Sequence, residues 1–305
     1  MNVLLIGLGS IARKHIKALR EIMPDVRITA LRSKQIGSET GVAGIRSIYQ
    51  WDEADENYDF IMITNPTHLH LETIEKAATL HRPLFIEKPP FHTIEGAQEI
   101  LEHLIKNNVP TYTAFNMRFL PVIEWLKNQC NELRIYEVQV YCGSYLPDWR
   151  PGKDYRKIYS ANKRMGGGVH LDLIHEIDYV RWIFGDPIDV KASASNISDL
   201  EITSFDHAHY WFRYDSKIVT IMLNYYRRDP KRSIEIVMEN DTWRADLLEG
   251  TVYNSKGIKL FESRLKISDT YKIQMDYFLD TLREGKLLMN GLEESIKTLK
   301  LSLSI

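Results

Sequence analysis

The sequence has little of what marks several specialised classes of protein. Its 305 residues include only two cysteines, Cys130 and Cys142, and no C-x-x-C pair, which excludes a disulfide framework and favours reduced thiols in a cytoplasmic protein. The formal net charge is only -2, so there is no basic field of the kind that holds a protein on nucleic acid. Internal repeats and low-complexity tracts are missing as well.

Long hydrophobic runs are also absent from the sequence. No apolar stretch approaches the ~18 residues that span a bilayer, and residues 1–7 lack the basic leader and the small-residue cleavage site of a signal peptide. We therefore expect neither a membrane nor nucleic acid as a partner. The composition, 44% hydrophobic and 26% charged, is typical of folded globular proteins, and a length of 305 residues predicts two domains.

Residues 1–118 show the alternation of strands and helices that is typical of a parallel α/β sheet. Strands are expected at residues 3–6, 26–31, 60–64, 84–86 and 111–114, with helices at 11–23, 68–80 and 94–106. Pro83 and Pro110 mark the ends of two of these helices, because proline cannot continue a helix. The segment is predicted to be an N-terminal Rossmann domain with a doubly wound parallel sheet.

Residues 119–305 follow a different pattern. Alternating segments at 134–141, 207–214, 218–226 and 233–238 predict an antiparallel or mixed sheet. Helices are expected at 122–129, 169–184, 271–282 and 292–301. We therefore predict a second, C-terminal domain of the α+β class, with a tight boundary near residue 118.

The first strand runs directly into G-L-G-S-I-A at residues 7–12, a G-x-G-x-x-A turn that opens a helix. Gly7 permits the tight turn, Gly9 lets the backbone approach a pyrophosphate, and Ala12 allows close helix packing. Phosphates bind at such a helix N-terminus, so Gly7, Gly9, Ser10 and Ile11 are predicted to bind a dinucleotide. The alternative is a strand-to-helix turn with a purely structural role.

The end of the second strand carries no acidic residue. A site that prefers NAD has Asp or Glu there to bind the ribose 2′-hydroxyl, whereas this chain has Arg32, Ser33 and Lys34. These side chains are suited to a 2′-phosphate, so NADP is favoured as the cofactor and NAD is the second possibility. The alternative is that they are ordinary solvated loop residues.

An acid and a base follow the fourth strand. Glu87 and Lys88 come directly after the buried residues 84–86, and two prolines fix the backbone beyond them. Ligands of open α/β sheets bind at the carboxyl ends of the strands, so both residues are expected near the nicotinamide ring. Asn116 and Arg118, after the fifth strand, are expected on the same side. A surface ion pair is the alternative for Glu87 and Lys88.

Three motifs, in this order and spacing, resemble the glucose-fructose oxidoreductase/inositol dehydrogenase family, often called Gfo/Idh/MocA. They are the turn at residues 7–12, T-N-P-T-H at 64–68 with His70, and E-K-P at 87–89. The resemblance implies that Asn65, Pro66 and His70 touch the dinucleotide and that Lys88 lies where cofactor and substrate meet. It also implies an open, mainly antiparallel sheet in the second domain that binds substrate and forms a homodimer or homotetramer.

The predicted helix at 169–184 carries charged residues among apolar ones. Asp172, His175 and Tyr179 fall at i, i+3 and i+7, which predicts one shared face and an Asp–His pair suited to general base catalysis. A structural Asp–His pair is the alternative. The family pattern D-x-x-x-H places histidine where Glu176 stands. The segment is similar to a family subgroup found with sialic-acid-like sugar pathways, which implies the catalytic role for His175.

A loop rich in proline and glycine precedes this helix. It contains Trp149, Arg150 and Tyr155, whose stacking faces and hydrogen-bond donors suit a polar ring that carries a phosphate or carboxylate. With Arg118 and Tyr179 they are predicted to bind substrate, although a well-packed surface loop is an equal alternative. The spacings of His68, His70, His81 and His170 do not fit a metal site, so no metal is expected.

Together these patterns predict hydride transfer between nicotinamide and a carbinol or carbonyl carbon of a sugar or nucleotide-sugar derivative. His175 is expected to take the hydroxyl proton while Asp172 holds its ring, and Lys88 to stabilise the oxyanion. One alternative on the same fold is the reduction of an imine or a C=C bond. The other is a non-catalytic protein that senses NAD(P).

Overall fold

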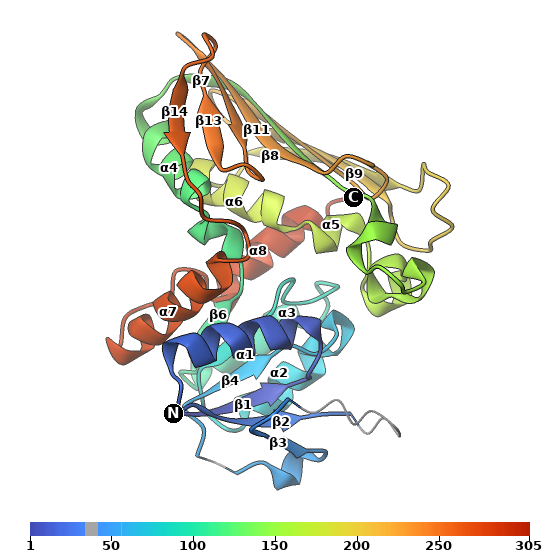
Figure 1. The fold of residues 1–305 in the computed structure, drawn as a ribbon, viewed down its shortest axis with the longest axis vertical. Helices are drawn as coiled ribbons and strands as arrows, with labels where there is room; N and C mark the ends of the chain where they lie inside the picture. The colour runs from blue at the N-terminus through green and yellow to red at the C-terminus, as the bar shows by residue number, and fades with distance from the viewer. Residues whose placement is uncertain (34–41, 56) are drawn as a thin grey trace. The chain divides into compact units, whose positions relative to one another are not determined.

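The structure is a computed structural model that describes residues 1–33, 42–55 and 57–305. The chain divides into two compact units (Figure 1). The first comprises Met1–Phe115 and Tyr271–Ile296, and the second comprises Asn116–Thr270 and Lys297–Ile305. The chain thus leaves the first unit close to the predicted boundary at residue 118. It differs from the predicted division in that residues 271–296 return to the first unit.

A six-stranded parallel sheet forms the centre of the first unit, as predicted. Its strands lie in the order β3-β2-β1-β4-β5-β6, which is the order of doubly wound dinucleotide-binding folds. The strands are β1 (Asn2–Ile6), β2 (Arg27–Leu31), β3 (Ile45–Ile48), β4 (Phe60–Ile63), β5 (Leu84–Ile86) and β6 (Thr111–Thr113). The edge strand β3 was not predicted, because only Ile48 among its four residues is fully buried and no alternation marks it.

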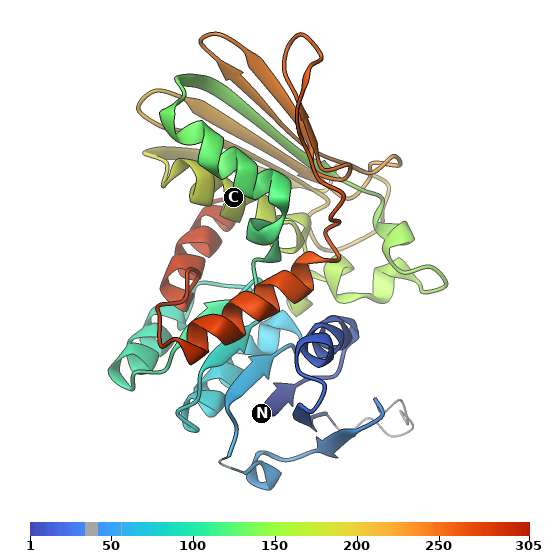
Figure 2. The same cartoon turned by 60° about the vertical axis from the view of Figure 1, so that its left-hand side comes forward.

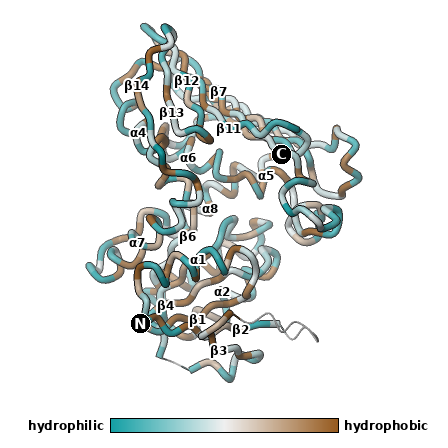
Figure 3. The backbone as a smooth tube through the Cα atoms, in the orientation of Figure 1, coloured by the Kyte–Doolittle hydropathy of each residue, from teal (hydrophilic) through white to brown (hydrophobic). Residues whose placement is uncertain are grey.

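Helices of the first unit begin and end close to the predicted positions. They are α1 (Ser10–Ile22), α2 (His70–Ala78), α3 (Ala97–Lys106), α7 (Thr270–Arg283) and the first part of α8 (Leu292–Ser302). Figure 3 shows mostly hydrophobic residues along β1 and β4 and both hydrophobic and hydrophilic residues along α1. None of the helices in the described part of the chain is long and apolar enough to cross a membrane.

Helix α7 completes the hydrophobic core of the first unit. The ring of Phe278 lies 5.1 Å from that of Phe60 in β4 and 5.2 Å from that of Phe85 in β5. Beyond α7, the backbone of Asn290 accepts a 2.8 Å hydrogen bond from the amide of Thr113 in β6. The apolar periodicity of residues 271–282 predicted the helix but could not identify the sheet on which it packs.

The second unit contains an eight-stranded sheet in the order β14-β13-β12-β11-β7-β10-β9-β8. Only β7 and β10 pair in parallel, so the sheet is mostly antiparallel. The strands are β7 (Ile135–Gly143), β8 (Asp189–Ser195), β9 (His207–Arg213), β10 (Ile218–Asn224), β11 (Lys231–Met238), β12 (Thr242–Asp246), β13 (Thr251–Tyr253) and β14 (Lys259–Glu262). The sequence did not predict β8, β12, β13 or β14, which are short or rich in polar and small residues.

Helices cover one face of this sheet. They are α4 (Pro121–Gln129), α5 (Val169–Asp172) and α6 (His175–Phe184), and both Figure 1 and Figure 2 show them on the same side. Alternate strand residues, such as Val138, Val140 and Ile221, are buried against them. The opposite face of the sheet carries the other set of alternate side chains, which are partly or fully exposed.

The single helix predicted at 169–184 is wrong, because a turn at residues 173–174 separates α5 from α6. Leu173 has φ -100° and ψ 29°, outside the helical region. No proline or glycine lies between Asp172 and His175, so the sequence contains no signal for this interruption. The argument that Asp172, His175 and Tyr179 share one helical face therefore fails.

A buried ion pair joins α6 to the sheet. Glu176 is fully buried, and its Oε1 lies 2.6 Å from Nε of Arg232 in β11. Arg232 lies on the covered face of the sheet, in register with Cys142 of β7. Because a buried charge without a partner is costly, the pair fixes which face of α6 meets the sheet.

The substitution Arg232→Met is expected to lower the free energy of unfolding by about 3–5 kcal/mol, because it leaves the Glu176 carboxylate buried without its partner. The double variant Arg232→Met/Glu176→Leu should recover most of that loss. Urea unfolding followed by circular dichroism measures both. As the control, Arg244→Met removes an exposed pair with Glu235 and should cost less than ~1 kcal/mol. Equal losses in the single and double variants would contradict this account.

Candidate functional site

The site begins where the strand order of the first sheet reverses, between β1 and β4. Gly7 follows β1 with φ +87°, a conformation that side chains disfavour. A Cβ at this position would lie 2.9 Å from backbone atoms of Asn65, which follows β4. The hydroxyl of Thr64 donates to the carbonyls of Ile6 and Gly7 at 3.0 and 3.1 Å. The two strand ends are therefore joined closely at the position where doubly wound sheets bind ligands.

The first turn of α1 is available to an anion. Its N-cap is Gly9, which provides no side-chain hydrogen bond to the amides of the first turn. Gly9 and Ser10 are exposed, and nothing lies within 4 Å of a Cβ built on Gly9. Free amides and the positive end of the helix dipole suit a pyrophosphate. The residues present thus fit the predicted dinucleotide at Gly7, Gly9, Ser10 and Ile11.

The loop after β4 brings two of the predicted cofactor residues to the same edge. Asn65 is half-buried and Pro66 is exposed. His70, by contrast, is buried, and its ring nitrogens lie 3.0 Å from the carbonyl oxygen of Asn65 and 3.1 Å from that of Pro90. Burial lowers the pKa of His70, which favours the neutral ring. A neutral ring carries one N–H and donates to one of these two carbonyls, and this geometry gives no support to its predicted contact with the dinucleotide.

Glu87 and Lys88 follow β5 at the adjacent position of the sheet. The buried carboxylate of Glu87 contacts Nε2 of His15, and its second oxygen accepts a 3.1 Å hydrogen bond from the amide of Lys88. Lys88 itself is half-buried. The carboxylate of Glu87 therefore fixes the backbone at Lys88.

His15 was missed by sequence reasoning, although a signal was present. It stands on the apolar face of α1 with Ala12, Ile16 and Leu19, all of them buried. A titratable residue at an apolar helical position needs a buried partner, and that partner is Glu87. The pair links the helix of the glycine turn to the loop that carries Lys88.

Arg32 and Ser33 lie at the carboxyl end of β2, next to the end of β1. Arg32 is half-buried, with Nη1 3.5 Å from Oγ of Ser47, and Ser33 is exposed. Lys34, the third predicted residue, lies outside the described residues.

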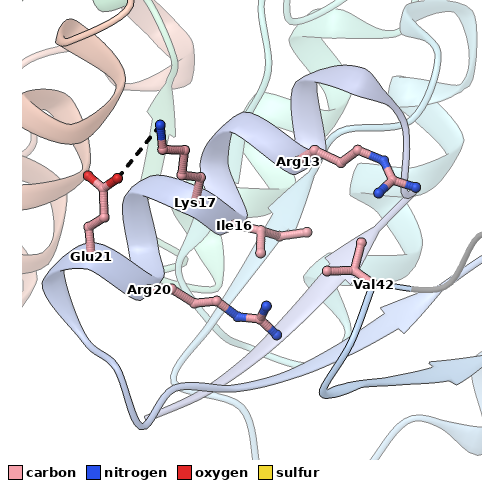
Figure 4. A pocket seen from close by; sticks show the side chains of 6 residues that line it. All are labelled: Arg13, Ile16, Lys17, Arg20, Glu21 and Val42. Carbon is pink, nitrogen blue, oxygen red and sulfur yellow. Dashed lines mark ion pairs between the residues drawn. The ribbon is translucent and has the colours of Figure 1, made fainter.

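Two hollows of the first unit do not coincide with these residues. One of about 410 Å³ lies along the side of α1 (Figure 4) and is lined by Arg13, Ile16, Lys17, Arg20, Glu21 and Val42. A second, of about 770 Å³, includes Asp59, Pro83 and Pro110, which precede strands of the sheet. The second lies at the amino ends of the strands, opposite the edge where ligands bind. We assign neither hollow to the cofactor.

In the second unit, two tyrosines hold the carboxylate of Asp172. The hydroxyl of Tyr159 donates to Oδ1 at 2.6 Å, and that of Tyr225 donates to Oδ2 at 2.5 Å. Burial, and then the charge of Asp172, raises the pKa of both phenols well above the usual value, so they remain protonated donors. Sequence reasoning missed both tyrosines: Tyr225 lies 53 residues from Asp172, and no regular spacing relates Tyr159, 13 residues before it, to Asp172.

The structure separates the roles of His175 and Glu176. His175 is the first residue of α6 and 9% exposed, whereas Glu176 is fully buried in its pair with Arg232. Glu176 therefore has a structural partner, and His175 remains the candidate proton acceptor. Tyr179 is also fully buried, and burial raises the pKa of its hydroxyl. Its place in the core does not support the predicted contact with substrate.

Two further predicted residues are engaged inside the second unit. Arg118 donates from Nε and Nη2 to the carboxylate of Asp178 in α6, at 2.8 and 2.6 Å, and both residues are buried. The amide of Asn116 donates to the hydroxyl of Thr270 at 2.6 Å. These contacts assign both residues structural roles and lend no support to the predicted ligand contacts.

The loop residues predicted to bind substrate lie close to Asp172. Trp149 donates from Nε1 to Ser144 at 2.8 Å, and its ring meets that of Tyr225 edge-on at 5.3 Å. The guanidinium of Arg150 lies 5.8 Å from the ring centroid of Tyr159. The loop thus packs on both tyrosines that hold Asp172. Tyr155, further along, is half-buried beside Arg156.

Comparison with known families gives independent evidence. Residues 1–115 match the model described as an oxidoreductase family with an NAD-binding Rossmann fold, and residues 133–244 match the GFO/IDH/MocA C-terminal domain. Together the two segments cover more than half of the chain. The chain belongs to the Gfo/Idh/MocA oxidoreductase family. This confirms the family that the three sequence motifs indicated.

Relatives within the Gfo/Idh/MocA family include dehydrogenases of inositol. The chain is 28% identical over 205 residues to an inositol 2-dehydrogenase of Rhizobium meliloti, covering 65% of this chain and 59% of the relative. It is also 28% identical over 213 residues to a myo-inositol 2-dehydrogenase of Thermotoga maritima, covering 66% and 60%. The chain therefore spans about three fifths of the length of these relatives.

Solved structures of the Gfo/Idh/MocA family share the whole fold. A UDP-N-acetylglucosamine 3-dehydrogenase from Acidithiobacillus ferrooxidans has a TM-score of 0.81 at 18% identity and covers 100% of this chain and 96% of its own. A levoglucosan dehydrogenase in complex with NADH and levoglucosan has a TM-score of 0.82 at 17% identity and covers 100% and 96%. These likenesses confirm the predicted fold class for both units.

Gly7→Ala and Gly9→Ala are expected to have different effects. At Gly7 the new methyl group meets the backbone of Asn65 at a left-handed φ, which should lower the free energy of unfolding by at least ~1–2 kcal/mol. Gly9 has φ -82° and open space around it, so its substitution should leave stability within ~0.5 kcal/mol. Dinucleotide binding should nevertheless weaken in Gly9→Ala, because the methyl group occupies the phosphate approach. Thermal unfolding and fluorescence titration test this. Equal stability of the two variants would contradict it.

Proposed function

We propose that this protein is an NAD(P)-dependent oxidoreductase that transfers a hydride between nicotinamide and a carbinol or carbonyl carbon of a sugar derivative. The observation that carries the proposal is the position of Lys88. It follows β5 at the carboxyl edge of a Rossmann sheet, two strands away from the glycine turn that follows β1, with β4 between them. The names of the relatives, dehydrogenases of inositols and levoglucosan, support a polyhydroxylated substrate.

The side chains divide the chemistry among them. A nicotinamide ring, when bound, accepts or donates the hydride. Lys88 supplies positive charge to the oxygen that gains negative charge as its proton leaves. His175 takes the hydroxyl proton. Asp172, three residues before His175, supplies a negative charge that two tyrosine hydroxyls hold in place.

Lys88→Ala is expected to lower kcat by on the order of 10³-fold, because the oxyanion loses its stabilising charge. Cofactor binding, measured by fluorescence titration, should remain within a few-fold of wild type. The assay follows absorbance of the reduced nicotinamide with a panel of inositols, neutral sugars and acidic sugars. Lys76→Ala, which removes an exposed ion pair with Glu72 on α2, is the matched control and should leave turnover unchanged.

A wild-type kcat in Lys88→Ala would contradict the assignment of Lys88 as the group that stabilises the oxyanion. Tight cofactor binding by the wild-type protein with no hydride transfer to any substrate class would favour the sensor alternative. Turnover of imines that survives loss of both Lys88 and His175 would favour a C=N reductase.

For the cofactor, we propose a preference for NADP over NAD. Support comes from the end of β2, where Arg32 and Ser33 take the place of the acidic residue typical of NAD sites. A guanidinium forms charge-assisted hydrogen bonds with a 2′-phosphate and gains little from a ribose hydroxyl. The levoglucosan dehydrogenase structure, by contrast, contains NADH, so preference within the fold is set locally.

Arg32→Ala should raise the Kd for NADPH by about 10–100-fold and leave the Kd for NADH within about twofold. Separate fluorescence titrations of the two reduced cofactors provide the measurement. Arg27→Ala is the control, since Arg27 is exposed at the opposite end of the same strand. A parallel loss of both cofactors would indicate damage to the fold and not loss of a phosphate contact.

We propose further that the protein forms a homodimer or homotetramer through the uncovered face of the second sheet. Ile218 and Met222 of β10 are 38% and 37% exposed on that face, and Trp211 of β9 pairs with Thr220, which lies between them on the same face. Large apolar side chains on one exposed sheet face are typical of protein interfaces.

A cytoplasmic location is consistent with Cys130 and Cys142, both free and buried.

A further inference from the structure

Positive charge is concentrated in one part of the second unit. Residues 145–165 carry six lysines and arginines and only two acidic residues, although the whole chain has a formal net charge of -2. Residues 225–231, the turn between β10 and β11, add Arg227, Arg228 and Lys231 with one acidic residue, Asp229. Such a local excess is unexpected for a slightly acidic protein and suggests a ligand of opposite charge.

The two positive segments pack on each other. The amide of Leu146 donates to the carbonyl of Tyr225 at 2.8 Å, and the ring of Trp149 meets that of Tyr225 at 5.3 Å. The guanidinium of Arg228 lies 3.7 Å from the ring centroid of Tyr145. These contacts bring the beginning of the first segment against residues 225–228 of the second.

Two of these cations, Arg150 and Arg228, form what we call the basic cluster. Arg150 lies over the ring of Tyr159 at 5.8 Å and Arg228 over the ring of Tyr145 at 3.7 Å. Among the residues that the structure describes, neither of the two has an ion pair with an acid.

Neighbouring cations differ from the basic cluster. Arg227 is paired with Asp229 at 2.5 Å, and Arg156 with Asp154 and Glu201. A guanidinium that stacks on an aromatic face keeps its N–H edge available for a planar or tetrahedral oxyanion. The cluster is therefore positioned by rings while its charge remains uncompensated.

The basic cluster is one side chain away from the proposed catalytic machinery. Tyr159, whose ring carries Arg150, donates its hydroxyl to Asp172. Tyr225, the second donor to Asp172, contacts Trp149, which precedes Arg150. All of these residues belong to the second unit, whereas the dinucleotide residues belong to the first. The cluster lies in the unit that carries the loop residues predicted to bind substrate, so we assign an anion bound there to the substrate.

We propose that the basic cluster binds an oxyanion, a carboxylate or a phosphate, that is covalently part of the sugar substrate. The protein then acts on acidic sugars in preference to neutral ones. This inference rests on the proposed function for the reaction but concerns a binding step that is measured without turnover.

Binding is tested first in the absence of hydride transfer. Tryptophan fluorescence of the full chain is titrated with D-glucuronate, D-glucose 6-phosphate and UDP-glucose, and with D-glucose and myo-inositol as neutral counterparts. At least one acidic sugar should bind at least tenfold more tightly than D-glucose, and its affinity should fall as salt is raised. The Trp149→Phe variant should lose the fluorescence change, which locates the signal at the loop.

Variants then test the cluster itself. Arg150→Gln and Arg228→Gln should each raise the Kd and KM for the acidic sugar at least tenfold and leave kcat and cofactor affinity within about threefold. Arg244→Gln, at an exposed pair elsewhere in the second unit, should change none of these values. D-Glucuronate carries a carboxylate, whereas D-glucose 6-phosphate and UDP-glucose carry phosphates. The sugar that binds most tightly therefore shows which oxyanion the cluster prefers.

The outcomes separate this inference from the proposed function. Binding of acidic sugars that the two variants weaken, with no hydride transfer, would support the anion site and overturn the proposed reaction. Hydride transfer with neutral sugars that neither variant affects would support the reaction and overturn the anion site. Unchanged affinity for acidic sugars in both variants would also overturn the anion site.

Discussion

The backbone of Asn65 occupies the space in which a side chain at Gly7 would have to lie. Through this contact the ends of β1 and β4 approach each other at the point where the strand order of the first sheet reverses. The amide of Gly7 also donates to the carbonyl of Leu31 at 2.9 Å, so the end of β2 is fixed to the same point. This one packing constraint positions the glycine turn, the loop after β4 and Arg32.

Two histidines extend that constraint to the loop that carries Lys88. The buried ring of His70 packs between the carbonyls of Asn65 and Pro90, and His15 contacts the carboxylate of Glu87 from the buried face of α1. Both histidines have a structural role without a bound ligand, because each is a hydrogen-bonding partner for a buried polar group. In the second unit the same principle operates at Asp172, whose two carboxylate oxygens each accept a tyrosine hydroxyl. The residues assigned to chemistry are thus held by a layer of polar partners.

Sequence reasoning predicted what depends on local spacing. The glycine turn, the strand ends and the E-K-P segment each have a mechanism that a short run of residues reveals, and the parallel sheet follows from their alternation. Partners that are remote in sequence were not accessible to it: Tyr225 lies 53 residues from Asp172, and Arg232 lies 56 from Glu176. The turn at 173–174 was missed because Leu173 and Ile174 also occur within helices. The ion pair of Arg118 with the buried Asp178, 60 residues away, was not predicted.

Helix α7 gives the first unit an unusual dependence on the far end of the chain. Phe278 covers Phe60 and Phe85, and Gln274 accepts a hydrogen bond from the hydroxyl of Tyr112, so residues 1–115 alone would expose a large apolar face of their sheet. During synthesis from the ribosome, the core of the first unit is therefore incomplete until residues 271–296 have been made, even though its sheet is made first. The second unit is inserted between these two segments in sequence, and a hydrogen bond from Asn116 to Thr270 joins the two ends of the insertion.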